Sequence, residues 1–168
     1  MDLKTPRLLL RKPVPADLED FLEYFTEPSV ANFLGGFPPS DRNGASIIFK
    51  GNMLSEYSWV VELTENGRTK VIGDVHFGNI VCGYLAHVGY VFNKNYRGRG
   101  YATEALSAVV DYGFSELGFG RIRAITQICN MPSQRLLERC GFTKEALIYD
   151  GDFNGKIDDL FYYSKSKY

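Results

Sequence analysis

A short run of arginine and glycine has the residue types and spacing of an anion-binding loop. Residues 97–100 read Arg-Gly-Arg-Gly, between an apolar strand pattern that ends at Phe92 and a helical pattern that starts at Tyr101. The first N–H groups of a helix have no partner inside it, and the helix dipole adds about half a positive charge there. Glycine has no Cβ, so a phosphate oxygen can approach these amides closely. The segment is predicted to hold a pyrophosphate.

Two better-known phosphate-binding loops do not fit this segment. A Walker loop requires GxxxxGK[ST], a string that the sequence does not contain. A Rossmann loop requires GxGxxG and an acidic residue about twenty positions later. Gly98 and Gly100 are followed by Tyr101-Ala102-Thr103, so the third glycine is missing. Neither nucleotide-binding fold is predicted.

The loop does resemble the acetyl-CoA loop of the GNAT superfamily of N-acetyltransferases. That pattern is Arg or Gln, two residues, Gly, one residue, then Gly or Ala, and Arg97, Gly100 and Ala102 fill its three places. Residues 130–142 are similar to the NxxSxxxLEKxGF segment of the branch that acetylates ribosomal-protein N-termini, the RimJ/RimL type. Residues 6–11, 154–156 and 162–164 also resemble that branch. The similarity covers nearly the whole chain except about 35–57.

The resemblance implies roles for individual residues. The loop amides would hold the cofactor pyrophosphate, and the preceding strand would carry a bulge whose backbone contacts the pantetheine and the thioester. Asn130 would bind the pantetheine arm. The implied acetyl-CoA site consists of Tyr90, Val91, Phe92, Arg97, Gly98, Arg99, Gly100, Tyr101, Ala102, Thr103, Asn130 and Ser133.

Two residues are candidates for proton transfer. The Ser133 hydroxyl could protonate the departing CoA thiolate, directly or through water, although a serine at this place is also a common helix N-cap. Many relatives use a glutamate on the strand before the loop as the base, and His87 stands there instead; a neutral imidazole can do the same work near pH 7. The other reading of His87 is structural. His76, in the middle of a strand, is interpreted as structural.

Composition sets limits on the class of protein. The 168 residues carry a net charge of −1 and a pI near 6.1, which disfavours nucleic acid as a lasting partner. There is no signal peptide and no apolar stretch near 18 residues, so a cytoplasmic protein without membrane contact is expected. Cys82, Cys129 and Cys140 show no CxxC spacing, so reduced core thiols and no metal are expected. The acidic residues in 150–152 and 158–159 are interpreted as a solvated loop.

The hydrophobic pattern predicts one domain over residues 1–168 with a mixed α/β fold. The resemblance implies a mostly antiparallel central sheet with a splayed pair of strands and flanking helices. Helices are expected from Pro15 to Phe25 and over 29–34, 46–54, 101–117 and 133–139. Strands are expected over 7–11, 59–63, 70–77, up to 92, and over 121–129, 145–149 and 157–164.

These observations lead to one predicted activity. An acetyl-CoA-dependent N-acetyltransferase would transfer the acetyl group directly to a primary amine, without a covalent enzyme intermediate. The branch suggests a protein or peptide α-amine as acceptor, whereas residues 35–57, expected to form the acceptor wall, could equally suit a polyamine, an amino acid or an aminoglycoside. A non-catalytic acyl-CoA sensor is the alternative, and a homodimer is left open.

Overall fold

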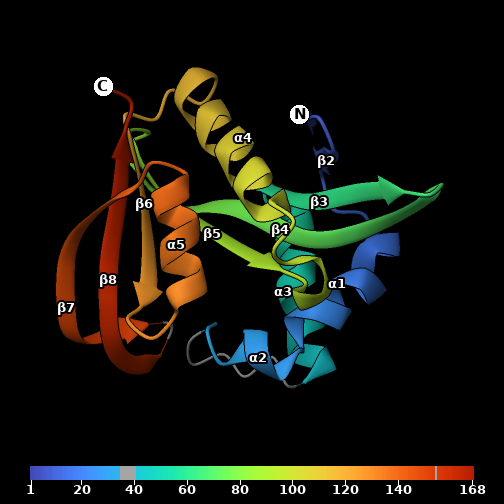
Figure 1. The fold of residues 1–168 in the computed structure, drawn as a ribbon, viewed down its shortest axis with the longest axis horizontal. Helices are drawn as coiled ribbons and strands as arrows, with labels where there is room; N and C mark the ends of the chain where they lie inside the picture. Colours follow the sequence, from blue (N-terminus) through green and yellow to red (C-terminus); the bar gives the residue numbers. More distant parts are fainter. Residues whose placement is uncertain (35–40, 154) are drawn as a thin grey trace.

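The computed structural model describes residues 1–34, 41–153 and 155–168 (Figure 1). Within these ranges the strands form one eight-stranded sheet in the order β1-β2-β3-β4-β5-β6-β8-β7. The strands are β1 (Leu3–Lys4), β2 (Leu8–Arg11), β3 (Ser58–Glu65), β4 (Arg68–Val81), β5 (Leu85–Phe92), β6 (Arg121–Gln127), β7 (Thr143–Phe153) and β8 (Lys156–Ser166). The helices are α1 (Leu18–Phe25), α2 (Pro28–Ala31), α3 (Arg42–Leu54), α4 (Tyr101–Ser115) and α5 (Met131–Arg139), with 3₁₀ turns at Pro15–Asp17 and Lys94–Tyr96. This order confirms the predicted fold class.

The junction between β5 and β6 differs from every other pairing in the sheet. These two strands run parallel and pair only over Leu85 to His87 of β5 and Arg121 to Arg123 of β6. Beyond that, β5 continues to Phe92 and β6 continues to Gln127 without pairing to each other, and Figure 1 shows the two strands diverging. The facing edges therefore keep backbone N–H and C=O groups that need other partners. This is the splayed pair that the resemblance implied.

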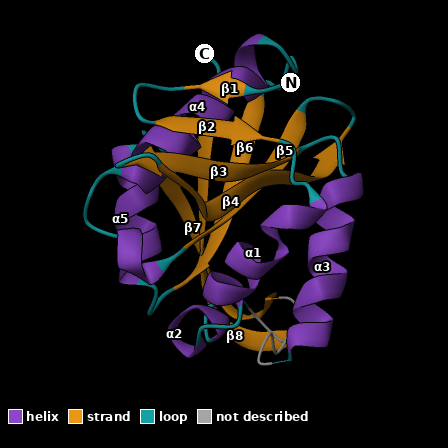
Figure 2. Ribbon diagram, turned by 90° about the vertical axis from the view of Figure 1, so that its right-hand side faces the viewer, coloured by secondary structure: helices purple, strands orange, loops and turns teal. Residues whose placement is uncertain are grey.

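Helices cover both faces of the sheet (Figure 2). Helix α4 packs on one face because its apolar residues recur at three and four positions; Ala105, Leu106, Val109 and Val110 are completely buried there. On the opposite face Phe21 and Phe25 of α1 pack against Val91 of β5. The strand that carries the predicted thioester contacts is thus held from both sides.

A bulge expected at residues 90–92 lies elsewhere. The ladder between β4 and β5 is regular from Gly73↔Phe92 to Gly78↔His87, and its irregularity falls between Gly78 and Val81. The Asn93 N–H donates to the Ile72 carbonyl of β4 at 2.9 Å. Since successive peptide groups of a strand alternate between its two edges, the backbone of Tyr90 and Phe92 faces the gap, whereas the backbone of Val91 faces β4.

The last hairpin is longer than predicted. Strand β7 reaches Phe153 and β8 begins at Lys156, so the acidic residues around 150 and 158 lie in strands and not in a loop. The sequence pattern did not predict the full length of these strands, because most of β7 is exposed and its residues are polar. A register irregularity between Ile148 and Gly151, with Asp150 at φ +50°, also interrupts the strand pattern in the sequence. The predicted turn residue 154 lies outside the described residues.

Other boundaries shifted by a few residues. Helix α3 begins at Arg42 rather than 46 because the Asp41 carboxylate accepts the Asn43 N–H at 2.8 Å as an N-cap. Of the three cysteines only Cys140 is buried; Cys82 and Cys129 are exposed, so the expectation of core thiols was wrong for those two. In the described part of the chain no helix is long and apolar enough to cross a membrane.

Candidate active site

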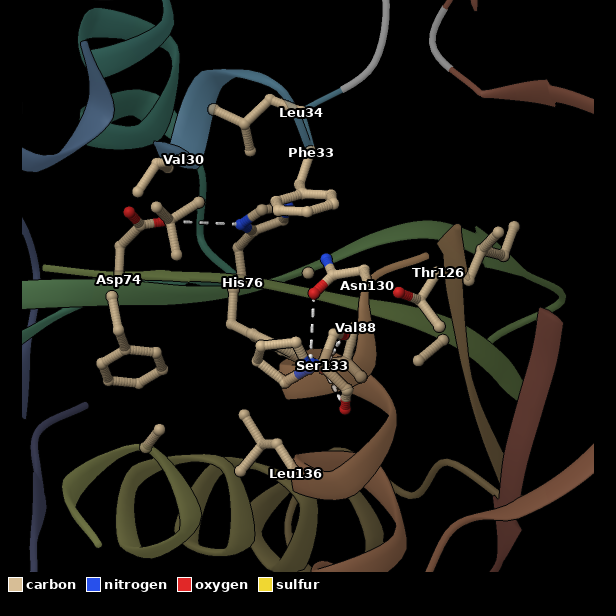
Figure 3. Close-up of a pocket in the computed structure, with 18 of the residues that line it drawn as sticks. Val30, Phe33, Leu34, Asp74, His76, Val88, Thr126, Asn130, Ser133 and Leu136 are labelled. Atoms are coloured by element: carbon tan, nitrogen blue, oxygen red, sulfur yellow. Dashed lines mark hydrogen bonds and ion pairs between the residues drawn. The ribbon is translucent and has the colours of Figure 1, made fainter. Parts of the chain in front are cut away.

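A cleft of about 920 Å³ opens where β5 and β6 separate. It is bounded by the Arg-Gly loop, the start of α4 and α5, the middle of β4, and the segment from α1 to α3 (Figure 3). All the residues predicted to bind the cofactor or move protons line this one cleft, except Arg99.

The Arg-Gly loop has the backbone that the sequence predicts. Gly98 and Gly100 have φ of +78° and +83°, values that residues with a Cβ rarely adopt, and Gly100 is the N-cap of α4. A Cβ at Gly98 would meet no atom within 4 Å, so the space next to it is open. The loop and the first turn of α4 therefore present a concave backbone to the cleft, and this backbone fits a diphosphate.

Arg7 supports the loop from the side away from the cleft. Its guanidinium donates to the Arg99 carbonyl at 2.8 Å and to the Glu104 carboxylate at 2.7 Å, and lies 4.5 Å from the centre of the Tyr101 ring. Burial alone would raise the pKa of Glu104, but hydrogen bonds from Thr5 and Arg7 outweigh it and hold that pKa below its usual range. This support was missed because the partners are almost a hundred residues apart.

Two predicted residues direct their side chains away from the cofactor position. The Arg99 guanidinium lies 3.6 Å from Glu65 and 5.9 Å from the Tyr96 ring centre. The Tyr101 hydroxyl donates to Glu65 at 2.6 Å, although Tyr101 also lines the cleft. The side chains of both residues hold the loop against β3, so only their backbone groups can bind a ligand.

Ser133 is not the N-cap of its helix. The cap of α5 is Asn130, whose side-chain oxygen accepts the Ser133 N–H at 3.2 Å. The Ser133 hydroxyl instead pairs with the Tyr90 hydroxyl at 2.7 Å. In Figure 3 the Asn130 amide nitrogen points away from Ser133, so the amide can donate to a ligand while its oxygen caps the helix.

Tyr90 adds a proton donor behind Ser133. Burial raises the pKa of Tyr90 well above its ordinary value, and the hydrogen bond with Ser133 lowers it only in part. The phenol therefore keeps its proton throughout the neutral range. The sequence indicated only the backbone of Tyr90 as functional.

His87 faces the cleft from β5, opposite Gly78 of β4 and beside Arg123 of β6. Burial lowers the pKa of His87 from 6.5, and the positive charge of Arg123 lowers it further. The imidazole is therefore neutral at pH 7, as a proton acceptor must be.

A second imidazole lines the same cleft. His76 projects from β4 and its Nδ1 lies 3.6 Å from the Asp74 carboxylate (Figure 3). Asp74 is only 3% exposed and accepts a hydrogen bond of 2.9 Å from the buried Tyr24 hydroxyl. Nothing in the sequence marks this group as functional, because Tyr24 is fifty residues from Asp74 and the pattern of β4 does not show which face is functional.

One end of the cleft is apolar. Phe25, Val30, Phe33 and Ile48 line it near His76. Ile48 and Asn52 of α3 belong to the segment 35–57 that was expected to form an acceptor wall; residues 35–40 lie outside the described part.

Comparisons with known proteins agree with this geometry. The family model of the acetyltransferase (GNAT) domain matches residues 7–143. The protein named "Uncharacterized N-acetyltransferase p20" of Bacillus licheniformis is 33% identical over 98% of this chain and 96% of its own length. The ribosomal protein uS5-alanine N-acetyltransferase of Escherichia coli K12 is 32% identical over 92% of this chain and 87% of its own. The crystal structure of a GNAT acetyltransferase from Bacillus anthracis superposes with a TM-score of 0.87, at 29% identity, over 99% of this chain and 98% of that one.

Proposed function

The chain belongs to the GNAT family of acetyltransferases, which use acetyl-CoA, and we propose that it acetylates the α-amine of a protein or peptide directly. The observation that carries the acetyl-transfer part of this proposal is the splay of β5 from β6 beside the Arg-Gly loop. It opens one cleft that reaches from the concave backbone of the Arg-Gly loop, past Ser133, to an apolar end with two imidazoles. We also propose that the protein works in the cytoplasm.

Each part of the cleft has a separate role in this proposal. The N–H groups from Gly98 to Thr103 hold the diphosphate beside the side chain of Arg97, whose own N–H is bonded to the Lys94 carbonyl. Asn130 with the free edge of β5 holds the pantetheine arm. The N–H of Phe92, which faces the gap, polarises the thioester carbonyl. When bound, acetyl-CoA supplies an activated acetyl group.

Direct transfer is supported by where the thiols lie. Cys140 is buried against α4, and Cys129 is exposed; neither is among the described residues that line the cleft. Burial raises the pKa of the Cys140 thiol, which disfavours a thiolate nucleophile. Positioning and proton transfer are enough for attack by a neutral amine on a thioester.

The peptide acceptor rests on one relative. The Escherichia coli protein acts, by its name, on the alanine of a ribosomal protein. An apolar end that opens beside the imidazoles suits a small N-terminal side chain. Polyamines, amino acids and aminoglycosides are the competing acceptors.

The test is a thiol-release assay with acetyl-CoA and four classes of amine: peptides with N-terminal Ala or Ser, spermidine, free amino acids and an aminoglycoside. Release with the peptides, and a mass shift of one acetyl group confined to their N-terminal residue, is expected. The control is the same peptides with a blocked α-amine. Turnover of only a small-molecule amine would overturn the peptide assignment, and binding without turnover of any amine would overturn the activity.

A further inference from the structure

We propose that His76 is the catalytic base that takes the proton of the acceptor amine, and that Asp74 and Tyr24 are positioning residues that hold its imidazole. This inference rests on the proposed function and assigns to His76 the role that the sequence resemblance suggested for His87. Three contacts support it: the imidazole of His76 faces Asp74, Tyr24 holds Asp74, and the far side of the ring lies over Gly89.

The strand register puts these side chains on one face. Asp74 and His76 are two residues apart on β4, so both point to the same side of the sheet, opposite Val91 and Gly89 of β5. Both residues line the cleft. The cross-strand partner of His76 is Gly89, which directly precedes Tyr90, the residue whose peptide group faces the gap.

The buried end of the imidazole is directed at a fixed carboxylate. Nδ1 is buried and makes no hydrogen bond to the described residues; it lies 3.6 Å from the nearer Asp74 oxygen, while the side chain as a whole is 40% exposed. The Tyr24 hydroxyl holds the other Asp74 oxygen at 2.9 Å. A carboxylate on the Nδ1 side favours the tautomer with its proton on Nδ1, which leaves the Nε2 lone pair free to accept a proton. The gap of 3.6 Å is longer than a hydrogen bond, as is common for catalytic pairs before substrate binds.

The other end of the imidazole fills the space above Gly89. A Cβ at residue 89 would come within 2.5 Å of Nε2 and 2.6 Å of Cε1. Gly89 is thus what allows Nε2 to lie against β5, and no positive φ requires a glycine there. In Figure 3 the ring extends from β4 towards Phe33, at the apolar end of the cleft.

This arrangement balances the protons of the reaction. The acceptor enters as R–NH₃⁺ and gives one proton to Nε2, and the neutral nitrogen forms the C–N bond to the acetyl carbon as the C–S bond breaks. The sulfur takes a proton from the hydroxyl pair of Ser133 and Tyr90, and the second proton lost by the amine restores that pair. The imidazolium then releases its proton to solvent through its exposed edge.

His87 lacks such support. Its neighbour on β6 is Arg123, a cation that opposes the protonated form which a base must become. The other ionisable groups that line the cleft, apart from tyrosines, are Arg97, Arg135 and Arg139. Among the described cleft residues, His76 is the imidazole that faces a carboxylate.

The first experiment compares pH–rate profiles of His76→Gln, His87→Gln and Asp74→Asn. We expect His76→Gln to lower kcat by about 10²-fold or more and to abolish the acid limb of the profile. Asp74→Asn should lower kcat by about 10- to 100-fold, as losses of orienting partners do. The dissociation constant of coenzyme A, measured by calorimetry, should not change. If His87→Gln removes the acid limb and His76→Gln keeps it, the assignment is wrong.

The second experiment uses Gly89→Ala, which displaces the imidazole without removing it. We expect a large loss of kcat in the wild-type background and almost no further loss when His76 is already alanine. A loss of equal size in both backgrounds would mean that the methyl group blocks the cleft directly, and would contradict the proposal. In the protein without cofactor, ¹⁵N NMR should show the Nδ1–H tautomer of His76 in the wild type and its loss in Asp74→Asn; no difference between the two would also contradict it.

Failure of this inference is distinguishable from failure of the proposed function. If the function is wrong, the wild-type protein releases no thiol with any amine. If only the base is wrong, the wild type turns over and His76→Gln keeps both its rate and its acid limb.

Discussion

The hydroxyl groups of Tyr90 and Ser133 lie 2.7 Å apart and join β5 to the first turn of α5 across the cleft. The two strands that flank this contact have already separated, so it spans the place where the strand edges no longer pair. Since Asn130 caps the helix through the backbone of Ser133, the serine hydroxyl is not needed for the cap. The pair is thus free to serve the chemistry.

Ser133→Ala should slow the chemical step and leave the fold unchanged. We expect kcat to fall by about 10²-fold, the lower part of the range for a lost general acid, with a smaller fall for Tyr90→Phe. The Km for acetyl-CoA should hardly change, since binding rests on backbone groups. Steady-state kinetics and thermal melts measure both effects. The matched control is Ser107→Ala, a partly buried helical serine outside the described cleft lining; equal kinetics for the two variants would exclude the role.

Gly98→Ala should weaken cofactor binding through a single methyl group. Gly98 and Gly118 have almost the same φ, +78° and +74°, and at both positions a Cβ would meet no atom of the described residues within 4 Å. Alanine should therefore cost each site about 1–2 kcal/mol of backbone strain. Only Gly98 lies on the cleft. Calorimetry should show that Gly98→Ala lowers the affinity for coenzyme A at least tenfold, which is about 1.4 kcal/mol of binding free energy. Gly118→Ala should leave the affinity unchanged. Equal affinities would place the diphosphate elsewhere.

Local signals in the sequence were enough for the loop and most elements. Asn66 and Gly67 adopt φ of +52° and +74°, as the hairpin signal requires. Gly118 has a positive φ just beyond α4, which ends at Ser115, two residues earlier than predicted. These features depend on the conformational preferences of one or two residues. The sequence could predict them because no distant partner decides them.

Other features depend on partners that only the folded chain brings together. The orientation of Asp74 and His76 depends on strand register and on Tyr24 of another element. The N–H of Phe92 faces the gap because the neighbouring Asn93 N–H is hydrogen-bonded to the Ile72 carbonyl of β4. Strand β7 was predicted too short because an exposed strand at a sheet edge needs no apolar alternation. Such features are tertiary, and periodicity does not encode them.

Arg7→Met should loosen the cofactor loop without touching the cofactor. The variant keeps the apolar stem but removes the donors to the Arg99 carbonyl and to Glu104, a carboxylate only 15% exposed. We expect weaker binding of coenzyme A and a lower melting temperature. Arg42→Met, which removes a solvent-exposed ion pair with Glu19, is the control and should change neither. Unchanged affinity in Arg7→Met would show that the loop holds its shape alone.

The lowered pKa of Glu104 gives this support a pH dependence. A carboxyl whose pKa is lower in the folded state than in the unfolded chain stabilises the protein fully at pH values above its ordinary pKa near 4.5. This stabilisation is lost as the pH falls through the pKa of the folded state. Glu104→Gln should abolish this part of the acid sensitivity. Denaturant unfolding between pH 3 and 6, about the range in which carboxyls titrate, measures it. The same acid slope in both proteins would contradict the assignment.

His87 should also make folding stability rise with pH, because its pKa too is lowered in the folded protein. Burial, and then Arg123, lower its pKa below 6.5 in the folded protein. Between the folded value and 6.5 the unfolded chain binds a proton that the folded chain does not, so the free energy of unfolding increases with pH across that window and levels off above it. His87→Gln should remove the slope, and Arg123→Met should make it shallower by removing the cation. Urea unfolding from pH 5 to 8, about the interval in which histidine titrates, decides the matter: a slope that persists in His87→Gln would assign the titration to another group.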